Sequence, residues 1–188
     1  MSLRITAGAF RSRTIHTVPG QAVRPSPAML REALFNIVGP RIAGSRFLDL
    51  CAGSGAVGIE ALSRGAAHAT LVDSHPASIA VIRRNLEALG ALDRATILRR
   101  DAAHAPGDLT RRGERFDVAF LDPPYDTGTA GACVRAAGLR AIIPAAGRLY
   151  VQHRRGAALP AAPGWQLADE RRFGDTMLTT FEREEDGA

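Results

Sequence analysis

Short apolar segments alternate with segments of helical periodicity between residues 46 and 152, and this order constrains the fold more than any other feature. The predicted strands are Arg46–Cys51, Ala69–Val72, Ala95–Leu98, Phe116–Leu121 and Arg148–Gln152. One helix is predicted after the glycines that follow residue 51, and it continues to about Ser63. Two more are predicted over Pro76–Leu89 and about Thr129–Leu139. Strands that alternate with helices form a mostly parallel sheet covered on both faces. We therefore expect an α/β fold.

Hairpins are predicted at both ends of this α/β unit. Their candidate strands are Leu3–Ala7 and Arg13–Val18 at the N-terminus, and Trp165–Arg172 and Met177–Glu182 at the C-terminus. A helix is predicted to begin after the first hairpin, where Ser26 can cap it and Pro27 suits its first turn. We expect one domain over residues 1–188, in which a basic hairpin extension (1–22) precedes the core (23–188).

The composition fits a compact domain in a reducing compartment. The chain has 188 residues, 46% of them hydrophobic, which suits a single buried core. No stretch approaches the roughly 18 apolar residues of a membrane span, and the N-terminus lacks the apolar run of a secretory signal. Cys51 and Cys133 are too few for a disulfide framework, and the five histidines are scattered. We expect a cytoplasmic protein without a metal site.

Positive charge is concentrated near the N-terminus. The whole chain has a net charge of +5, whereas residues 1–46 contain seven arginines against one acid, Glu32, which gives 7 − 1 = +6. Arginine suits phosphate and base contacts because its planar fork donates two hydrogen bonds at once. This segment therefore predicts a polyanion-binding arm, and the alternative is a solvated charged face. The candidate RNA-binding residues are Arg11, Arg13, Arg24 and Arg31.

A glycine-rich turn follows the first predicted core strand. Residues 49–58 contain a G-x-G-x-x-G pattern, and glycines let a backbone approach a ligand closely beside the free N–H groups of a helix start. A dinucleotide and S-adenosylmethionine both fit such a turn. Asp49, at the strand end, would oppose a pyrophosphate and would attract the ammonium and sulfonium of S-adenosylmethionine. Asp49 could alternatively only brace the turn.

Two further carboxylates follow the next strands. Asp73 ends the second core strand, about 20 residues after Gly53, which suits a carboxylate that accepts from both ribose hydroxyls. Asp101 follows the third strand and could accept from an adenine amino group. Each could instead be a simple helix cap. Because ligands of open α/β sheets lie beyond the carboxyl ends of the strands, the joint placement of Asp49, Asp73 and Asp101 favours a ligand.

The most specific pattern is Asp122-Pro123-Pro124-Tyr125, which follows the most apolar strand. Two successive prolines remove two N–H donors, so the backbone here presents acceptors. If Asp122 and the Pro123 carbonyl each accept one N–H of an exocyclic amino group, its nitrogen lone pair can turn toward a methyl group. A base could stack on Tyr125, a contact worth about 1–3 kcal/mol. The target base would have to be unpaired or flipped out. The alternative is an ordinary Pro-Pro turn.

These motifs resemble a known family. Residues 49–60 together with residues 122–125 are similar to class I methyltransferases that act on amino nitrogens. The resemblance narrows to the bacterial 16S ribosomal RNA guanine-N2 methyltransferases (ribosomal small subunit methyltransferase D). It does so on four segments, Ile5–Arg13, Val23–Ser26, Arg31–Asn36 and Gly58–Ala66. In relatives, an Asp-Arg pair stands where this chain has Ala28-Met29, and an acid often stands where it has Gln152-His153.

The resemblance implies a Rossmann-like class I methyltransferase fold with a seven-stranded sheet, a C-terminal antiparallel hairpin and a small N-terminal hairpin extension. It implies methylation of one guanine N2 in 16S RNA, within the small subunit or its assembly intermediate, by a monomer. We expect S-adenosylmethionine to be bound by Asp49, Cys51, Gly53, Ser54, Gly55, Asp73, Asp101 and Ala102. We expect the guanine to be held by Asp122, Pro123, Pro124 and Tyr125.

Three alternatives remain at this stage. One is an amino methyltransferase for another RNA or DNA base, such as adenine N6, because the same four-residue motif serves those. The second is a nicotinamide-dependent oxidoreductase that uses the glycine turn, against which Asp49 and residues 122–125 count. The third is a catalytically inactive RNA-binding assembly factor.

Overall fold

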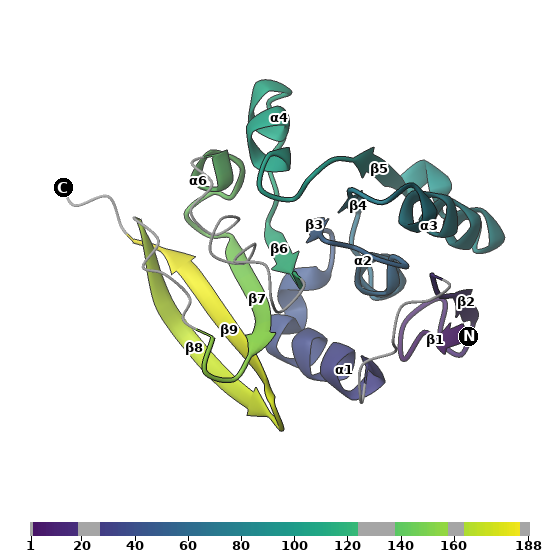
Figure 1. Cartoon of the computed structure of the whole chain (residues 1–188), viewed down its shortest axis with the longest axis horizontal. Coiled ribbons are helices and arrows are strands. Elements are labelled where there is room, and N and C mark those ends of the chain that lie inside the picture. Colours follow the sequence, from purple (N-terminus) through teal and green to yellow (C-terminus); the bar gives the residue numbers. More distant parts are fainter. Residues whose placement is uncertain (1, 19–26, 124–137, 158–163, 185–188) are drawn as a thin grey trace.

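A seven-stranded sheet forms the centre of the computed structural model, which describes residues 2–18, 27–123, 138–157 and 164–184. The strand order is β5-β4-β3-β6-β7-β9-β8 (Figure 1). The strands are β3 (Arg46–Leu50), β4 (His68–Asp73), β5 (Ala95–Arg99), β6 (Val118–Leu121), β7 (Arg148–Arg154), β8 (Trp165–Phe173) and β9 (Thr176–Arg183). The five strands β3 to β7 are parallel, and the β8–β9 hairpin joins antiparallel to β7. This confirms the predicted fold class.

Helices cover both faces of the sheet. One face carries α1 (Pro27–Val38), α2 (Ala56–Ser63) and α3 (Pro76–Ala88), and the other carries α4 (Ala105–Arg111) and α6 (Gly138–Ile142). Short 3-10 turns, Gly39–Ile42 and Leu92–Arg94, precede β3 and β5. The sequence pattern does not predict α4, because this helix has only seven residues and its first turn contains Gly107, a residue of low helix propensity. Most of the helix predicted at 129–139 lies outside the described residues.

Side chains of each strand alternate between the two layers. Phe47, Leu71 and Phe120 pack in the core under α1, α2 and α3. Leu48, Val72 and Leu121 pack in the core under α4 and α6. Because successive strand residues point to opposite faces, Asp49 lies on the α2 side, in line with Phe47. The same alternation places Asp122 on the side of Phe120 and Gln152 on the side of Tyr150, so these three polar residues share one face.

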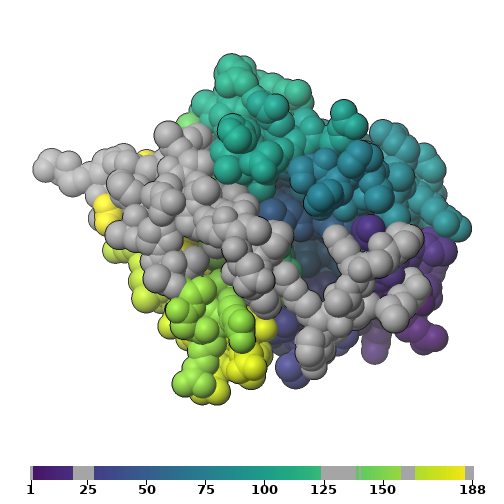
Figure 2. Space-filling model, in the orientation of Figure 1, coloured from purple at the N-terminus to yellow at the C-terminus, as the bar shows by residue number. Residues whose placement is uncertain are grey.

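The N-terminal hairpin packs against α2 and α3 rather than extending into solvent. Its strands, β1 (Ser2–Arg4) and β2 (Thr14–His16), are shorter than predicted and pair antiparallel. The connecting segment crosses the end of α2, where the Ala9 amide donates to the Ser63 carbonyl at 2.7 Å. A Cβ at Gly8 (φ +81°) would lie 1.9 Å from that carbonyl oxygen, so this crossing requires glycine. In Figure 2 the hairpin, in purple, lies against the blue-to-teal surface of α3.

The remaining elements follow the predictions to within a few residues at their ends. Ser26, the predicted cap of α1, lies outside the described residues. None of the helices in the described part of the chain has the length and apolar character needed to cross a lipid bilayer.

Candidate active site

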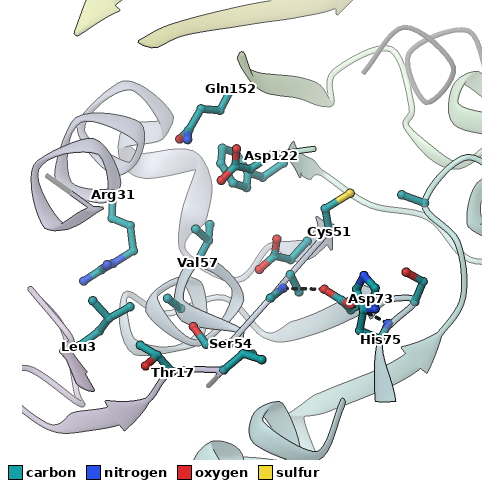
Figure 3. A pocket seen from close by; sticks show the side chains of 18 of the residues that line it. Leu3, Thr17, Arg31, Cys51, Ser54, Val57, Asp73, His75, Asp122 and Gln152 are labelled. Atoms are coloured by element: carbon teal, nitrogen blue, oxygen red, sulfur yellow. Dashed lines mark hydrogen bonds between the residues drawn. The ribbon is translucent and has the colours of Figure 1, made fainter. Parts of the chain in front are cut away.

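A cavity of about 500 Å³ opens at the carboxyl ends of β3, β4, β6 and β7. Its floor is the glycine turn between β3 and α2, and its sides include residues that follow β4, β5 and β6. Leu3, Thr17 and Val18 of the N-terminal hairpin also line it, together with Arg31 of α1 (Figure 3). A volume of this size lies in the range of small-molecule pockets. The cavity therefore combines the predicted glycine turn, the predicted acids and the N-terminal extension.

The glycine turn has the backbone conformation that a close ligand contact needs. Gly53 and Gly55 have positive φ angles of 57° and 79°, and Cys51 also has a positive φ of 66°. A Cβ at Gly55 would lie 3.0 Å from Leu71 Cδ2, so a side chain there would meet the core. The Ala52 amide donates to the Val72 carbonyl at 2.9 Å and fastens the turn to β4. The backbone of the turn thus stays close to the cavity, with Ser54 on its rim.

Asp49 places a carboxylate under this turn. Its side chain is buried and accepts a hydrogen bond from the Gly58 amide at 2.9 Å. Burial raises the pKa of Asp49 to about 8, and the negative charges of Asp122 and Asp73 raise it further, against the lowering effect of the Gly58 amide. A buried carboxylate that faces a cavity favours a positively charged ligand.

Asp73 and Asp101 line the cavity and also hold their own turns. Asp73 accepts from the Gly53 amide and from the His75 amide, both at 2.8 Å. Asp101 is exposed and accepts from the Ala103 amide at 2.9 Å. The cap interpretation and the ligand interpretation are therefore compatible for both residues, because a carboxylate oxygen has further lone pairs that can face the cavity. Ala102, also predicted at the site, lines the cavity beside Asp101.

The residues after β6 reach the same cavity. Asp122 is half-buried and lines the cavity, and its amide donates to the Leu50 carbonyl of β3 at 3.5 Å. Pro123 is buried. Pro124 and Tyr125 lie outside the described residues, so the stacking role of Tyr125 remains a prediction. Gln152, at the end of β7, lines the cavity next to Asp122 (Figure 3) and was not predicted as a site residue.

The candidate RNA-binding arginines separate into different environments. Arg11 and Arg13 are exposed on the hairpin, and Arg24 lies outside the described residues. Arg31 is only 4% exposed, and its Nε donates to Glu60 Oε2 at 3.4 Å. This burial does not support a surface phosphate contact, because Arg31 pairs with Glu60 inside the protein and lines the cavity, and RNA binding by Arg31 stays a prediction.

Glu60 joins α1, α2 and the N-terminal hairpin. Its fully buried carboxylate accepts from the Thr6 amide at 3.1 Å and the Ala7 amide at 3.1 Å. It also accepts from Arg31 and from Arg64, whose Nε lies 3.1 Å from Oε1. Arg31 extends further and donates from Nη2 to the Arg4 carbonyl at 2.6 Å. A count of charges along the sequence does not predict this cluster, because Thr6, Ala7 and Arg31 all lie more than 25 positions from Glu60.

Asn85 joins the hairpin to the glycine turn. This buried residue of α3 donates from Nδ2 to the His16 carbonyl at 2.9 Å and to the Ser54 carbonyl at 3.0 Å. Its Oδ1 accepts from the His16 amide at 2.8 Å. A single carboxamide therefore fixes β2 against the turn that forms the cavity floor.

The donor set fits an organic cation with a nucleoside better than a metal ion. No group of three or more histidine, cysteine, aspartate or glutamate side chains could hold a metal within the described ranges. Asp49 supplies a carboxylate for an ammonium, the turn supplies backbone contact, and Asp73 supplies an acceptor for hydroxyls. S-adenosylmethionine, with an ammonium, a sulfonium and a ribose, carries the groups that this set would bind.

The fold and this site together define a class I methyltransferase, the class that takes its methyl group from S-adenosylmethionine. Comparison with known proteins then gives the family: the chain belongs to the family described as Conserved hypothetical protein 95, whose model matches residues 3–182.

Named relatives in this comparison agree with that class. "Putative rRNA methyltransferase YlbH" of Bacillus subtilis is 35% identical over 182 residues, which cover 96% of this chain and 99% of the relative. "Ribosomal RNA small subunit methyltransferase D" of Escherichia coli is 31% identical, with 98% and 92% covered. The solved structure "Putative methyltransferase yhhF" from Escherichia coli superposes with a TM-score of 0.85 at 29% identity, and covers 98% of this chain and 99% of that one. The family resemblance expected from the sequence is confirmed.

Proposed function

We propose that this chain transfers a methyl group from S-adenosylmethionine to the exocyclic N2 of a guanine in 16S ribosomal RNA. The observation that carries the proposal is that Asp49 and Asp122 line one cavity from neighbouring parallel strands. One carboxylate suits a cation and the other suits an amino group, so the two reactants would meet between them. The printed names of the two sequence relatives, which both refer to ribosomal RNA, support this class of substrate.

The cofactor would be held by the glycine turn and the acids around it. Asp49 would pair with the ammonium, and Asp73 would accept from the ribose hydroxyls. Asp101 and Ala102 would border the adenine, while Cys51, Gly53, Ser54 and Gly55 would contact the rest of the molecule. S-adenosylmethionine supplies a methyl group attached to a positively charged sulfur, which is an electrophile.

The amino group of the base would be held by Asp122 and by the backbone carbonyl of Pro123, with Pro124 keeping that segment in shape and Tyr125 stacking on the ring. An aromatic amine is a poor nucleophile because its lone pair is delocalised into the ring. Two acceptors that grip its two N–H groups turn the lone pair toward the methyl carbon. Orientation of two bound reactants can lower a barrier by about 7–11 kcal/mol. As the new C–N bond forms and the C–S bond breaks, Asp122 would take the proton that leaves the nitrogen.

The RNA would approach over the N-terminal hairpin. Arg11 and Arg13 are exposed on an extension that also lines the cavity through Leu3 and Thr17. Phosphate contacts on the hairpin could therefore position an unpaired guanine over the opening. We propose the small ribosomal subunit, or its assembly intermediate, as the form in which the guanine is presented.

Transfer of a labelled methyl group tests the proposal. The purified chain is incubated with labelled S-adenosylmethionine and either unmodified 16S RNA, reconstituted small subunits or DNA, and the product is digested to nucleosides. We expect N2-methylguanosine from one of the two ribosomal substrates and no label in DNA. A product that contains only N6-methyladenosine, or label in DNA alone, would contradict the proposal.

A further inference from the structure

Gln152 is a largely buried polar residue that faces the cavity. It lies near the end of β7, is 8% exposed and lines the cavity. Its side-chain carboxamide has no hydrogen-bond partner among the described residues, and Figure 3 shows it pointing into the cavity beside Asp122. Buried amides in folded proteins are almost always hydrogen-bonded. A largely buried amide that faces a cavity can form its hydrogen bonds with a ligand that occupies that cavity.

The neighbouring residue shows the contrast. His153, also buried, points to the other face of the sheet, where its Nε2 lies 2.8 Å from Thr179 Oγ1 and its Nδ1 lies 3.1 Å from the Arg154 carbonyl. Among the described residues, the polar side chain on one side of β7 is therefore hydrogen-bonded within the protein, whereas Gln152 on the other side faces the cavity.

Strand register places Gln152 next to the group that would hold the amino nitrogen. Leu121 of β6 pairs with Val151 of β7, and the residues that follow these two are Asp122 and Gln152. Both point to the face that Phe120 and Tyr150 share. A flat base whose amino group is gripped by Asp122 would therefore present its adjoining ring edge to Gln152.

We infer that Gln152 recognises the base by hydrogen bonds to the ring edge beside the methylated amino group; this inference rests on the proposed function. In guanine, that edge carries the N1–H donor and the O6 acceptor. The Gln152 carbonyl would accept from N1–H, and its NH₂ would donate to O6. A carboxamide offers one donor group and one acceptor side by side, which matches this edge.

The carboxamide also has a property that a carboxylate lacks. Rotation by half a turn exchanges its donor and acceptor, so Gln152 could equally bind an edge that presents an acceptor and then a donor. 2,6-Diaminopurine presents that reversed edge and keeps the 2-amino group. A glutamate at this position would only accept, so it would bind guanine through N1–H but not the N1 lone pair of 2,6-diaminopurine.

The experiment compares two bases in one RNA. Once the methylated nucleotide is mapped, short RNAs are synthesised with guanine or 2,6-diaminopurine at that position. They are tested with the wild type, with Gln152→Glu and Gln152→Met, and with Gln166→Met as the matched control, because Gln166 is exposed on β8. Cofactor affinity by calorimetry and thermal unfolding verify that each variant is folded and loaded.

We expect the wild type to methylate both RNAs with kcat/KM values within about 10-fold of each other. For Gln152→Glu, kcat/KM on the guanine RNA should stay within about 10-fold of the wild-type value. Its kcat/KM on the 2,6-diaminopurine RNA should fall about 10- to 100-fold further, the loss typical of an unpaired buried group. Gln152→Met should lose about 10- to 100-fold on both bases, and Gln166→Met should lose nothing.

Two results would overturn the inference in different ways. If the wild type methylates guanine and Gln152→Met is as active as Gln166→Met, or if Gln152→Glu treats the two bases alike, Gln152 does not contact the base, and the proposed function stands. If the wild type binds S-adenosylmethionine yet yields no N2-methylguanosine in any RNA, the proposed function fails, and the role of Gln152 fails with it.

Discussion

The Asp49 carboxylate accepts a hydrogen bond from the Gly58 amide across 2.9 Å, yet its pKa is raised to about 8. One backbone donor near the start of α2 does not offset the desolvation of a fully buried charge. The nearby negative charges of Asp122 and Asp73 act in the same direction. A positively charged ligand beside Asp49 would favour its ionised form and lower this pKa. The protonation of Asp49 should therefore affect both the stability of the ligand-free protein and the binding of such a ligand.

Substitution of Asp49 by asparagine should stabilise the ligand-free protein at neutral to mildly alkaline pH. The folded-state pKa of about 8 lies above the ordinary value of 3.8, so the folded state holds one more proton between these values. Stability of the wild type should therefore fall as pH rises from about 4 to about 8, by up to roughly 1.4 kcal/mol per pH unit from this group. Urea unfolding at several pH values measures it. Asp93→Asn, at an exposed aspartate, is the control, and equal pH slopes for both variants would contradict the assignment.

Cofactor binding should release protons. At pH 7 Asp49 is mostly protonated in the free protein, and an ammonium beside it favours the ionised form, so binding expels a proton and affinity rises with pH up to about 8. Calorimetry in buffers of different ionisation enthalpy counts the protons. Asp49→Asn should abolish this release and weaken binding, whereas Asp93→Asn should leave both unchanged. Proton-neutral binding by the wild type would exclude this role.

Loss of the Asp122 carboxylate should reduce turnover and spare cofactor affinity. Asp122→Ala removes an acceptor for the amino group and the acceptor for its proton, and we expect kcat to fall about 10²- to 10⁴-fold. Asp122→Asn keeps one acceptor oxygen and should fall between the wild type and the alanine variant. Single-turnover methyl transfer with saturating cofactor is the measurement. Unchanged turnover in Asp122→Ala would refute the amino-holding role.

Removal of the Glu60 charge should loosen the N-terminal hairpin. Glu60→Gln leaves Arg31 and Arg64 without their carboxylate and replaces one of the two oxygens that accept from the Thr6 and Ala7 amides with an NH₂ donor. The change should cost about 3–5 kcal/mol of unfolding free energy. Hydrogen exchange at the Thr6 and Ala7 amides should accelerate before global unfolding. The matched control is Glu87→Gln, at an exposed glutamate of α3. If both variants lose the same small stability, Glu60 does not anchor the hairpin.

Charge reversal on the hairpin should weaken RNA binding and flatten its salt dependence. Arg11→Glu and Arg13→Glu remove exposed positive charges, and each lost phosphate contact should reduce the slope of log affinity against log salt by about 1. Arg112→Glu, at the exposed end of α4 on the other face of the sheet, changes the net charge equally and should have little effect. Filter binding over a range of salt concentrations distinguishes a local contact from a general charge effect. Equal losses in all three variants would indicate the latter.

The sheet and the glycine turn could be predicted because their signals are local. Apolar segments of strand length, separated by glycines and by helical periodicity, require no knowledge of distant contacts, and Asp49, Asp73 and Asp122 follow from their places at strand ends. The sequence does not predict the short helix α4, because it has only seven residues and Gly107 disfavours a helix locally, while its burial against α6 favours it. Tertiary packing here overrides propensity.

The remaining differences between the sequence-based predictions and the structure arise from contacts between residues far apart in the chain. Arg31 looked like one of several basic residues in an arm, and only the fold brings Glu60 against it, 29 positions away. Asn85 and Gln152 carry no local motif either. Their roles depend on which strands adjoin in the folded sheet, and a single sequence does not contain that information.

The three hydrogen bonds of Asn85 have a consequence for any attempt to shorten or recombine this protein. Since one carboxamide on α3 holds both the His16 backbone and the Ser54 carbonyl, the N-terminal hairpin is fixed in place as a wall of the cavity. A chain trimmed to start at residue 23 would open the pocket to water along the side now closed by Leu3, Thr17 and Val18. A hairpin grafted from a relative would function only if the matching surface of α3 were transplanted with it.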